Sequence, residues 1–290
     1  MTGGTEEREL EALHDAGIAL GLATAAAGLV SSTSRIIWHL PGPAAAVLIS
    51  RSGTKSLAEV DAEANAVRAA SDNGVRTPRL LAGPIELENR RIALAYEWVE
   101  GRPAAEADWP GVGQGLATLA AGTGAGLTVL RWPSDLPESH WAGVLGADLG
   151  KRFSQHCRHA QTSIDAMTSD RSKLVLCHGD VQPANVIVDA DGAPWLIDFE
   201  YACLAPREWD PAKLVILNRR FDDPHDLPAV LQAWPALDQA RLAVCVRVQE
   251  TLLVAWLVRM ARNQTPGAAA EAQHRARSLD EGSQRWRHLR

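Results

Sequence analysis

The sequence predicts an α+β protein of two lobes, with a small β-rich lobe over residues 1–100 and a larger, mainly helical lobe over residues 101–290. Short β-prone runs separated by turn residues fill much of the first hundred positions, and segments with helical periodicity fill most of the remainder. A chain of 290 residues is long for one compact core. We therefore expect the two lobes to share a cleft.

The pattern of the first lobe indicates strands joined by tight turns, with one crossing helix. A Pro-Gly-Pro turn at residues 41–43 separates two β-prone runs, and an Asn-Gly pair at 73–74 ends a helix whose apolar residues share one face. The expected elements are a helix at residues 5–20, strands at 35–40 and 45–50, a helix at 57–71, and a hairpin formed by 79–87 and 91–98.

The second lobe is expected to be helical around one β island at residues 173–200. An Arg-rich stretch from Arg275 to Arg290 is expected to be a solvated helix or tail. The expected helices cover residues 112–119, 144–167, 211–218, 237–262 and 268–286.

Composition and charge argue against several classes of protein. The net charge is −6, which argues against nucleic acid as a partner, since nucleic-acid binders carry a basic stripe. The N-terminus lacks the basic region of a secretory signal, and no apolar run is long enough to cross a bilayer. The four cysteines are scattered, so we expect no zinc site, no disulfide framework and a cytoplasmic location.

The β island holds polar residues in a pattern that is suited to chemistry. A buried strand at residues 174–177 leads into His-Gly-Asp at 178–180, and Asn185 opens the next strand. An Asp-Gly pair at 191–192 signals a hairpin turn, and Asp198 follows the returning strand.

The hairpin is expected to bring two of these side chains together. With Val188 opposite Trp195, the start of one strand meets the end of the other. Asn185 then falls opposite Asp198, and an amide oxygen and a carboxylate are both hard ligands suited to Mg²⁺. Asp180 lies five residues before Asn185, in the loop that leads to the same strand end.

Phosphoryl transfer from a nucleoside triphosphate needs such an arrangement. A divalent metal neutralises charge on the β- and γ-phosphates, and a separate carboxylate orients the attacking hydroxyl and accepts its proton. An Asp-x-x-x-x-Asn spacing followed by a strand-end Asp supplies both functions. The pattern therefore predicts a kinase-type site that uses Mg²⁺.

The run HGDVQPAN followed by LIDFE resembles the signature of the aminoglycoside phosphotransferase and choline kinase group of protein-kinase-like enzymes. The resemblance implies a bilobal protein-kinase-like fold, with Asp180 as the catalytic base and with Asn185 and Asp198 as ligands of Mg²⁺. It also implies that His178 braces the catalytic loop and that Glu200 lies near a second metal.

The resemblance further implies a nucleotide site in the first lobe. A loop between the first two strands would cover the phosphates, with contacts from Ser31, Ser32 and Ser34. The connection between the lobes corresponds to a hinge, in which backbone groups near Glu97 and Val99 would bind a purine.

The basic residue that would bind the α- and β-phosphates is harder to locate. Glu63 on the predicted helix matches the acidic residue that pairs with this cation in the group. The aligned strand position holds Leu48, so we expect Arg51, just beyond it, to reach the phosphates. Arg35 and Lys55 are the alternatives, and Arg51 is equally consistent with a solvated charge at a strand end.

The acceptor pocket is expected between the catalytic loop and the later helices. Asp222, Asp226 and Glu250 are candidate contacts; the first two lie in an acidic loop that could recognise an ammonium group or be a plain surface turn. The predicted reaction is transfer of the γ-phosphoryl group of ATP or GTP to a hydroxyl of a small molecule, with an antibiotic favoured. A small-metabolite kinase and a nucleotide-binding pseudokinase are the alternatives, and we expect a monomer or a homodimer.

Overall fold

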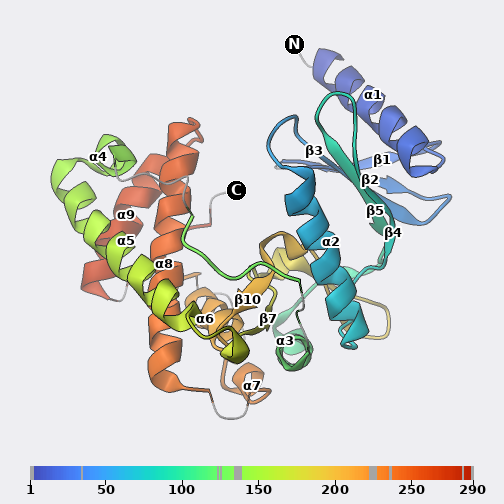
Figure 1. Ribbon diagram of the computed structural model, residues 1–290. Coiled ribbons are helices and arrows are strands. Elements are labelled where there is room, and N and C mark those ends of the chain that lie inside the picture. Colours follow the sequence, from blue (N-terminus) through green and yellow to red (C-terminus); the bar gives the residue numbers. More distant parts are fainter. Residues whose placement is uncertain are drawn as a thin grey trace.

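The structure, a computed structural model, divides into two lobes (Figure 1). It describes residues 3–33, 35–122, 124, 126–133, 139–221, 227–234, 237–282 and 284–288, with side chains from residue 7 onward. A five-stranded sheet flanked by helices forms the first lobe, and helices around short strands form the second. The predicted α+β bilobal fold is confirmed.

The sheet of the first lobe is antiparallel, with strand order β1-β2-β3-β5-β4. Helices α1 and α2 cover its two faces (Figure 1). The expected strands and helices of this lobe are present, and residues 28–32, expected as a loop, form the edge strand β1. The elements are α1 (Gly3–Leu20), β1 (Gly28–Ser32), β2 (Arg35–Leu40), β3 (Ala45–Ser50), α2 (Leu57–Asp72), β4 (Leu80–Glu86) and β5 (Ile92–Glu97).

Alternation along β5 decides which face of the sheet meets which helix. Ala93 and Ala95 are buried on the α1 side, where their small size lets the helix approach closely. Ile92, Leu94 and Tyr96 are buried on the opposite side, against α2 and the second lobe. The larger side chains of β5 therefore lie on the face of the sheet that is turned toward α2 and the second lobe.

A capping box fixes the start of α2. The hydroxyl of Ser56 accepts a hydrogen bond from the N–H of Glu59 at 3.3 Å, and the carboxylate of Glu59 accepts one from the N–H of Ser56 at 2.7 Å. These bonds satisfy backbone groups that the helix itself cannot pair. They also set where α2 begins, so that Glu63, one turn further on, points inward and is only 4% exposed.

The chain enters the second lobe through a close contact at Gly101. A Cβ at this position would lie 2.4 Å from the carbonyl oxygen of Val188, so only glycine fits. Strand β6 then pairs with β8, β8 pairs with β9, and β7 pairs with β10. These strands are β6 (Arg102–Pro103), β7 (Val175–Cys177), β8 (Val186–Val188), β9 (Pro194–Leu196) and β10 (Cys203–Ala205).

Helix α8 crosses the second lobe and contacts α4, α5, α6 and α9. Gly146, with φ of 85°, separates α4 from α5, so the helix expected at residues 144–167 begins only at residue 147. The α-helices are α3 (Trp109–Ala121), α4 (Ser139–Leu145), α5 (Ala147–Thr168), α6 (Trp209–Ile216), α7 (Leu227–Leu231), α8 (Gln239–Arg262) and α9 (Ala268–Glu281). The short 3₁₀ turns are η1 (Glu106–Asp108), η2 (Arg171–Lys173), η3 (Pro183–Asn185) and η4 (Phe199–Tyr201), and the π-helical turn is η5 (Leu217–Phe221).

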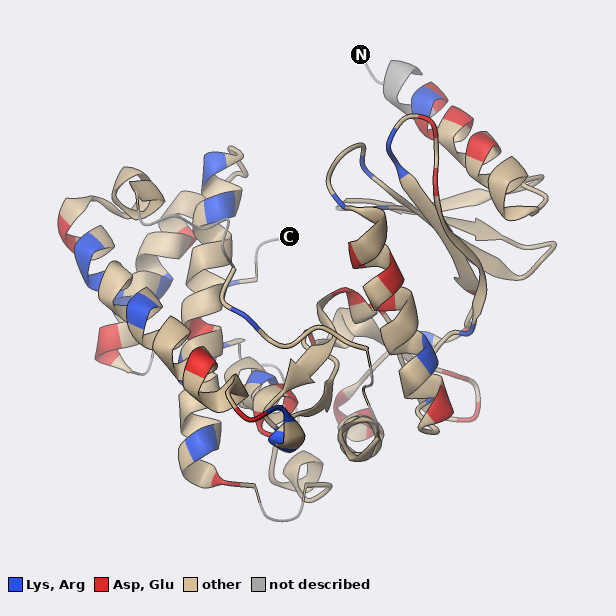
Figure 2. Cartoon of the chain, viewed as in Figure 1, with Lys and Arg blue, Asp and Glu red and all other residues tan. Residues whose placement is uncertain are grey.

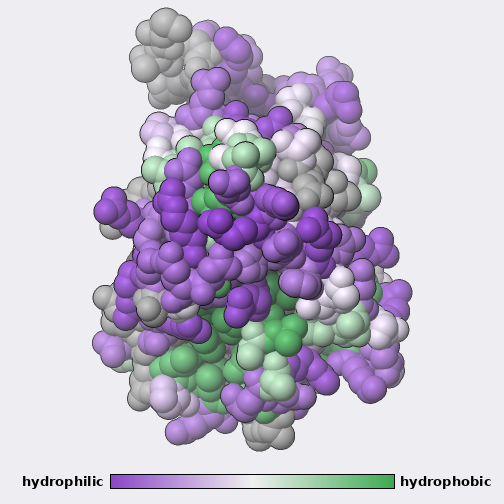
Figure 3. Space-filling model, turned by 90° about the vertical axis from the view of Figure 1, so that its left-hand side faces the viewer, coloured by the Kyte–Doolittle hydropathy of each residue, from purple (hydrophilic) through white to green (hydrophobic). Residues whose placement is uncertain are grey.

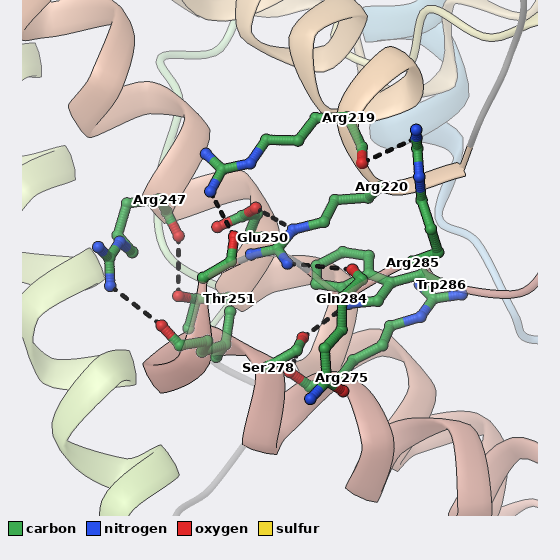
Figure 4. A network of polar contacts seen from close by, with 12 residues as sticks. Arg219, Arg220, Arg247, Glu250, Thr251, Arg275, Ser278, Gln284, Arg285 and Trp286 are labelled. Carbon is green, nitrogen blue, oxygen red and sulfur yellow. Dashed lines mark hydrogen bonds and ion pairs between the residues drawn. The ribbon is translucent and has the colours of Figure 1, made fainter.

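The segment of residues 284–288 folds back onto α9 and η5 (Figure 4). The N–H of Trp286 donates to the carbonyl of Arg220 at 2.6 Å, and its indole N–H donates to the hydroxyl of Ser278 at 2.8 Å. The guanidinium of Arg275 lies 4.9 Å from the Trp286 ring centroid. The expectation of a solvated helix or tail is therefore wrong, because a buried tryptophan anchors this segment.

None of the described helices is both long and apolar enough to span a membrane. The face shown in Figure 3 is largely hydrophilic, with hydrophobic side chains gathered mainly in its lower half. The large apolar residues of the described helices are mostly buried in the cores that join the elements.

Replacing Trp286 by Ala is expected to lower the free energy of unfolding by about 3–5 kcal/mol, because loss of a large buried aromatic side chain leaves a cavity. Trp256→Ala is the matched control, since the Trp256 side chain is 42% exposed, compared with 4% for Trp286. We expect the control to lose about 1 kcal/mol or less. Urea unfolding followed by circular dichroism measures both variants, and equal losses would contradict the anchoring role of Trp286.

Candidate active site

Two cavities adjoin at the strand ends of the β island. The interlobe cavity has a volume of about 400 Å³ and is lined by both lobes, including Asn185 and Asp198 on the side of the second lobe. The C-lobe cavity, also about 400 Å³, lies within the second lobe and has Asp180 on its wall. The amide of Asn185 donates to the carboxylate of Asp180 at 3.2 Å, so the two cavities meet at this pair.

The loop that carries Asp180 is held from several sides. Gly179 has φ of 84°, and a Cβ there would lie 2.1 Å from the carbonyl oxygen of Tyr201, so glycine is required. The carboxylate of Asp210 accepts the N–H groups of His178 and Gly179 at 2.8 and 2.9 Å. The buried His178 ring donates from Nε2 to the carbonyl of Ile197 at 2.9 Å, which ties the loop to the hairpin.

Asp180 lies at the centre of a polar cluster. Its Oδ1 accepts from Lys213 Nζ at 2.9 Å, and its Oδ2 accepts from Gln182 Nε2 at 2.9 Å and from Asn185 Nδ2. Lys213 comes from α6, and sequence reasoning missed it because nothing in the local motif indicates a cation 33 residues further along the chain. The three donors fix the orientation of the carboxylate at the edge of the C-lobe cavity.

The hairpin register differs from the predicted one by one residue. Val188 lies opposite Pro194 and Ile187 lies opposite Trp195, so the predicted pairing of Val188 with Trp195 is wrong. The N–H of Asp189 donates to the carbonyl of Ala193 at 3.1 Å, so the turn contains three residues rather than the two assumed from Asp-Gly.

Asn185 consequently lies opposite Ile197, whose N–H donates to the carbonyl of Asn185 at 3.0 Å. Asp198 follows with φ of 62°, a left-handed conformation that aspartate tolerates better than most residues. This turn directs the chain so that Asp198 still lines the same cavity as Asn185.

The geometry of Asn185 and Asp198 fits a divalent metal. Asn185 donates its amide N–H groups to the carbonyl and carboxylate of Asp180, and its amide oxygen is not used by a described residue. The carboxylate of Asp198 has no hydrogen-bond donor among the described residues. Shielding from water raises the pKa of Asp198, and the positive charge of Arg35 opposes this.

Two protein oxygens suit Mg²⁺, which is usually bound by one or two protein groups together with substrate phosphates and water. The described part of the chain contains no cluster of three or more His, Cys, Asp or Glu side chains that could hold a metal without such help. A metal at this position would therefore depend on a second ligand in the interlobe cavity.

The cation beside Glu63 is Arg35, from β2. Two hydrogen bonds of 2.7 and 2.6 Å join the guanidinium to the Glu63 carboxylate, and Glu200 lies 3.1 Å from it. Burial disfavours the charge, but the hydrogen bonds and negative charge of Glu63 outweigh this and raise the pKa of Arg35. Its buried Nε has no hydrogen-bond partner among the described residues, and Lys55 Nζ lies 2.8 Å from the carboxylate of Glu200. Of these four side chains, Arg35 and Glu63 line the interlobe cavity, so an anionic ligand there would meet the guanidinium beside its paired carboxylate.

Arg51, which we expected to reach the phosphates, points elsewhere. Its guanidinium donates to the backbone carbonyls of Thr33 and Ser32 at 2.7 and 2.8 Å, and it does not line the interlobe cavity. Arg35 lies opposite Ser50 in the β2–β3 ladder, on the same face as Leu48. The cation that we expected on β3 is thus supplied by the neighbouring strand β2. Alignment along β3 alone cannot reveal this.

The remaining nucleotide contacts predicted from the sequence fall into three groups. Ser31 lines the interlobe cavity, whereas Ser32 donates to Glu9 at 2.7 Å and does not line it. Glu97 and Val99 line the cavity at the connection between the lobes, and the N–H of Val99 is not used by a described residue. Ser34 lies outside the described residues.

The predicted acceptor contacts are not assembled as expected. Glu250 is buried and pairs with Arg220 at 2.6 Å, so it does not line the C-lobe cavity (Figure 4). Asp222 and Asp226 lie outside the described residues. The described wall near Asp180 instead contains Tyr201 and Trp256, neither of which the acceptor prediction selected with a specific role.

Several solved structures share this fold. Amicoumacin kinase hAmiN in complex with AMP-PNP, Ca²⁺ and Ami has a TM-score of 0.75 at 14% identity, over 98% of this chain and 97% of that chain. A choline/ethanolamine kinase family protein from Mesorhizobium loti has a TM-score of 0.67 at 18% identity, over 93% and 94%. Aminoglycoside phosphotransferase APH(3'')-Id from Streptomyces rimosus has a TM-score of 0.57 at 18% identity, over 86% and 98%. At these identities the likeness shows a common fold.

The family is shown by the sequence itself. No curated protein matches the chain. The profile of the phosphotransferase enzyme family, in contrast, matches residues 25–243, which is well over half of the chain and includes Arg35, Asp180, Asn185 and Asp198. The chain therefore belongs to the phosphotransferase enzyme family.

Proposed function

We propose that this protein transfers the γ-phosphoryl group of ATP or GTP to a hydroxyl group of a small molecule. One observation carries the proposal: Asp180, Asn185 and Asp198 converge where the interlobe cavity adjoins the C-lobe cavity. A nucleotide in the first cavity and an acceptor in the second would present their reacting groups to the same side chains. Membership of the phosphotransferase enzyme family supports this assignment.

The interlobe cavity is proposed to bind the nucleotide. Arg35, with its unpaired Nε, would donate to the phosphates, and Asn185 and Asp198 would hold a divalent metal, proposed to be Mg²⁺. The metal, when bound, would neutralise phosphate charge. The N–H of Val99, which no described residue accepts, offers a donor to a purine edge. The presence of AMP-PNP and Ca²⁺ in the hAmiN structure supports the use of a nucleotide and a divalent ion.

Asp180 is proposed to act as the general base. Its carboxylate is already oriented by Lys213 on one oxygen and by Gln182 on the other. The acceptor hydroxyl would approach from the C-lobe cavity and transfer its proton to Asp180. Its oxygen would bond to the γ-phosphorus as the bond from that phosphorus to the leaving oxygen breaks.

An antibiotic is the first candidate acceptor. The support is that proteins of the same fold include amicoumacin kinase hAmiN and a spectinomycin phosphotransferase. The choline kinase LicA from Streptococcus pneumoniae also shares the fold, with a TM-score of 0.66, which supports a small-metabolite kinase as the second candidate. We further propose a cytoplasmic location and a monomer or homodimer.

Asp180→Asn is expected to lower the rate of phosphoryl transfer by about 10²–10⁴-fold, because the general base is lost. Nucleotide affinity should be unchanged. Asp191→Asn, in the exposed hairpin turn, is the matched control and should keep full activity. A panel of antibiotics and small metabolites, incubated with ATP and Mg²⁺, is read by a mass gain of one phosphoryl group.

Full transfer by the Asp180→Asn variant would remove Asp180 from the role of base. Nucleotide binding by the unaltered protein, without phosphorylation of any compound in the panel, would favour the pseudokinase alternative.

Arg35→Gln is expected to weaken ATP binding by about tenfold or more, because a hydrogen bond from a charged donor to a phosphate is lost. Arg51→Gln removes the same charge from the end of β3, outside the interlobe cavity, and should leave ATP affinity unchanged. Isothermal titration calorimetry with ATP and Mg²⁺ measures both. A larger loss for Arg51→Gln than for Arg35→Gln would restore Arg51 as the phosphate-binding cation.

A further inference from the structure

The wall of the C-lobe cavity presents a large apolar surface beside Asp180. Phe221, Leu252 and Trp256 contribute to it from η5 and α8, and Trp256 is 42% exposed. A large aromatic side chain exposed at a cavity wall is suited to cover an apolar ligand. The cavity therefore favours an acceptor with an apolar body.

The described part of the same wall carries more basic than acidic side chains. Asp180 is the one carboxylate among the described residues that line it, and Lys213 pairs with this group. Figure 2 shows basic residues at the C-terminal end of α8 and in the segment between α3 and α4 that passes beside it. The basic residues of the described wall are Arg131, Lys213, Arg259 and Arg275.

These basic residues differ in how they are already bound. Lys213 donates to the carboxylate of Asp180 at 2.9 Å, and Arg275 donates to the buried Glu271 at 2.8 Å. Arg131 is exposed and forms no hydrogen bond or ion pair with a described residue. Arg131 and Arg259 line the cavity from two separate elements. A negative group on a ligand would meet positive charge on this described wall, whereas a cationic ligand would meet like charge.

We propose that the acceptor is an apolar alcohol that carries an anionic group such as a carboxylate; this rests on the function proposed above. Its apolar body lies on Trp256 and Leu252, its anionic group faces Arg131 and Arg259, and its hydroxyl reaches Asp180. The basic wall also offsets the repulsion that an anionic acceptor would otherwise feel from the triphosphate. A polycation, or a quaternary ammonium alcohol, does not match the described part of this wall.

Three alcohols of equal chain length test the proposal: a medium-chain ω-hydroxy fatty acid, its methyl ester, and the corresponding ω-hydroxyalkyl trimethylammonium ion. Isothermal titration calorimetry at low ionic strength measures their binding to the full chain. The acid is expected to bind about tenfold more tightly than the ester, as one charge-assisted contact predicts, and the ammonium ion least tightly.

Two variants locate the charge effect. Arg131→Gln and Arg259→Gln are each expected to reduce the preference for the acid over the ester while leaving the ester's affinity unchanged. Arg262→Gln, on the same end of α8 but outside the cavity wall, is the matched control and should keep the preference. Loss of the preference in the control alone would overturn the assignment of the anionic group to this cavity.

The outcomes separate this proposal from the proposed function. Tightest binding of the ammonium ion, equal binding of all three alcohols, or no binding of the acid overturns the acceptor class, whether or not transfer occurs. The bound acid is then incubated with ATP and Mg²⁺, and a mass gain of one phosphoryl group supports both proposals. Selective binding of the acid without transfer to any acceptor supports the ligand preference of the C-lobe cavity but overturns the phosphotransferase function, and with it the role of this ligand as acceptor.

Discussion

One buried carboxylate holds the loop on which the candidate site depends. Asp210, in the first turn of α6, accepts the N–H groups of His178 and Gly179. Burial raises the pKa of Asp210, so its charge relies on these two donors and on the neighbouring His178. The same helix supplies Lys213 to Asp180. A single short helix thus constrains both the backbone and the reactive carboxylate of the loop. The close contact at Gly179 also excludes any residue with a side chain at this position.

Short-range pattern was sufficient to predict the fold and the core of the candidate site. Asp180, Asn185 and Asp198 lie within one stretch of strands and turns, so their proximity follows from local geometry. The error of one residue in register arose from the turn, where the Asp189–Ala193 bond encloses three residues. Asp198 reaches the interlobe cavity despite this, because its left-handed backbone redirects the chain.

Long-range pairings could not be predicted in the same way. Arg35 on β2 pairs with Glu63 on α2, 28 residues further along the chain. Its position depends on β2 being the neighbour of β3 in the sheet, which the local sequence does not specify. Burial explains why the pair is so well satisfied: Glu63 is 4% exposed, and an unpaired charge at that depth would be costly. Physical chemistry demands a cation beside Glu63 but does not dictate which strand provides it. Glu250 was expected to contact the acceptor, but its ion pair with Arg220 buries it in the core instead.

The two cavities differ in which parts of the chain build them. In the described residues, the interlobe cavity draws its walls from both lobes, whereas the C-lobe cavity is built from residues 130–288 alone. A hinge motion about residues 98–101 would reshape the first and leave the second intact. If the protein acts as proposed, an acceptor site confined to one lobe would keep its shape at any lobe angle, whereas a nucleotide site between the lobes would not.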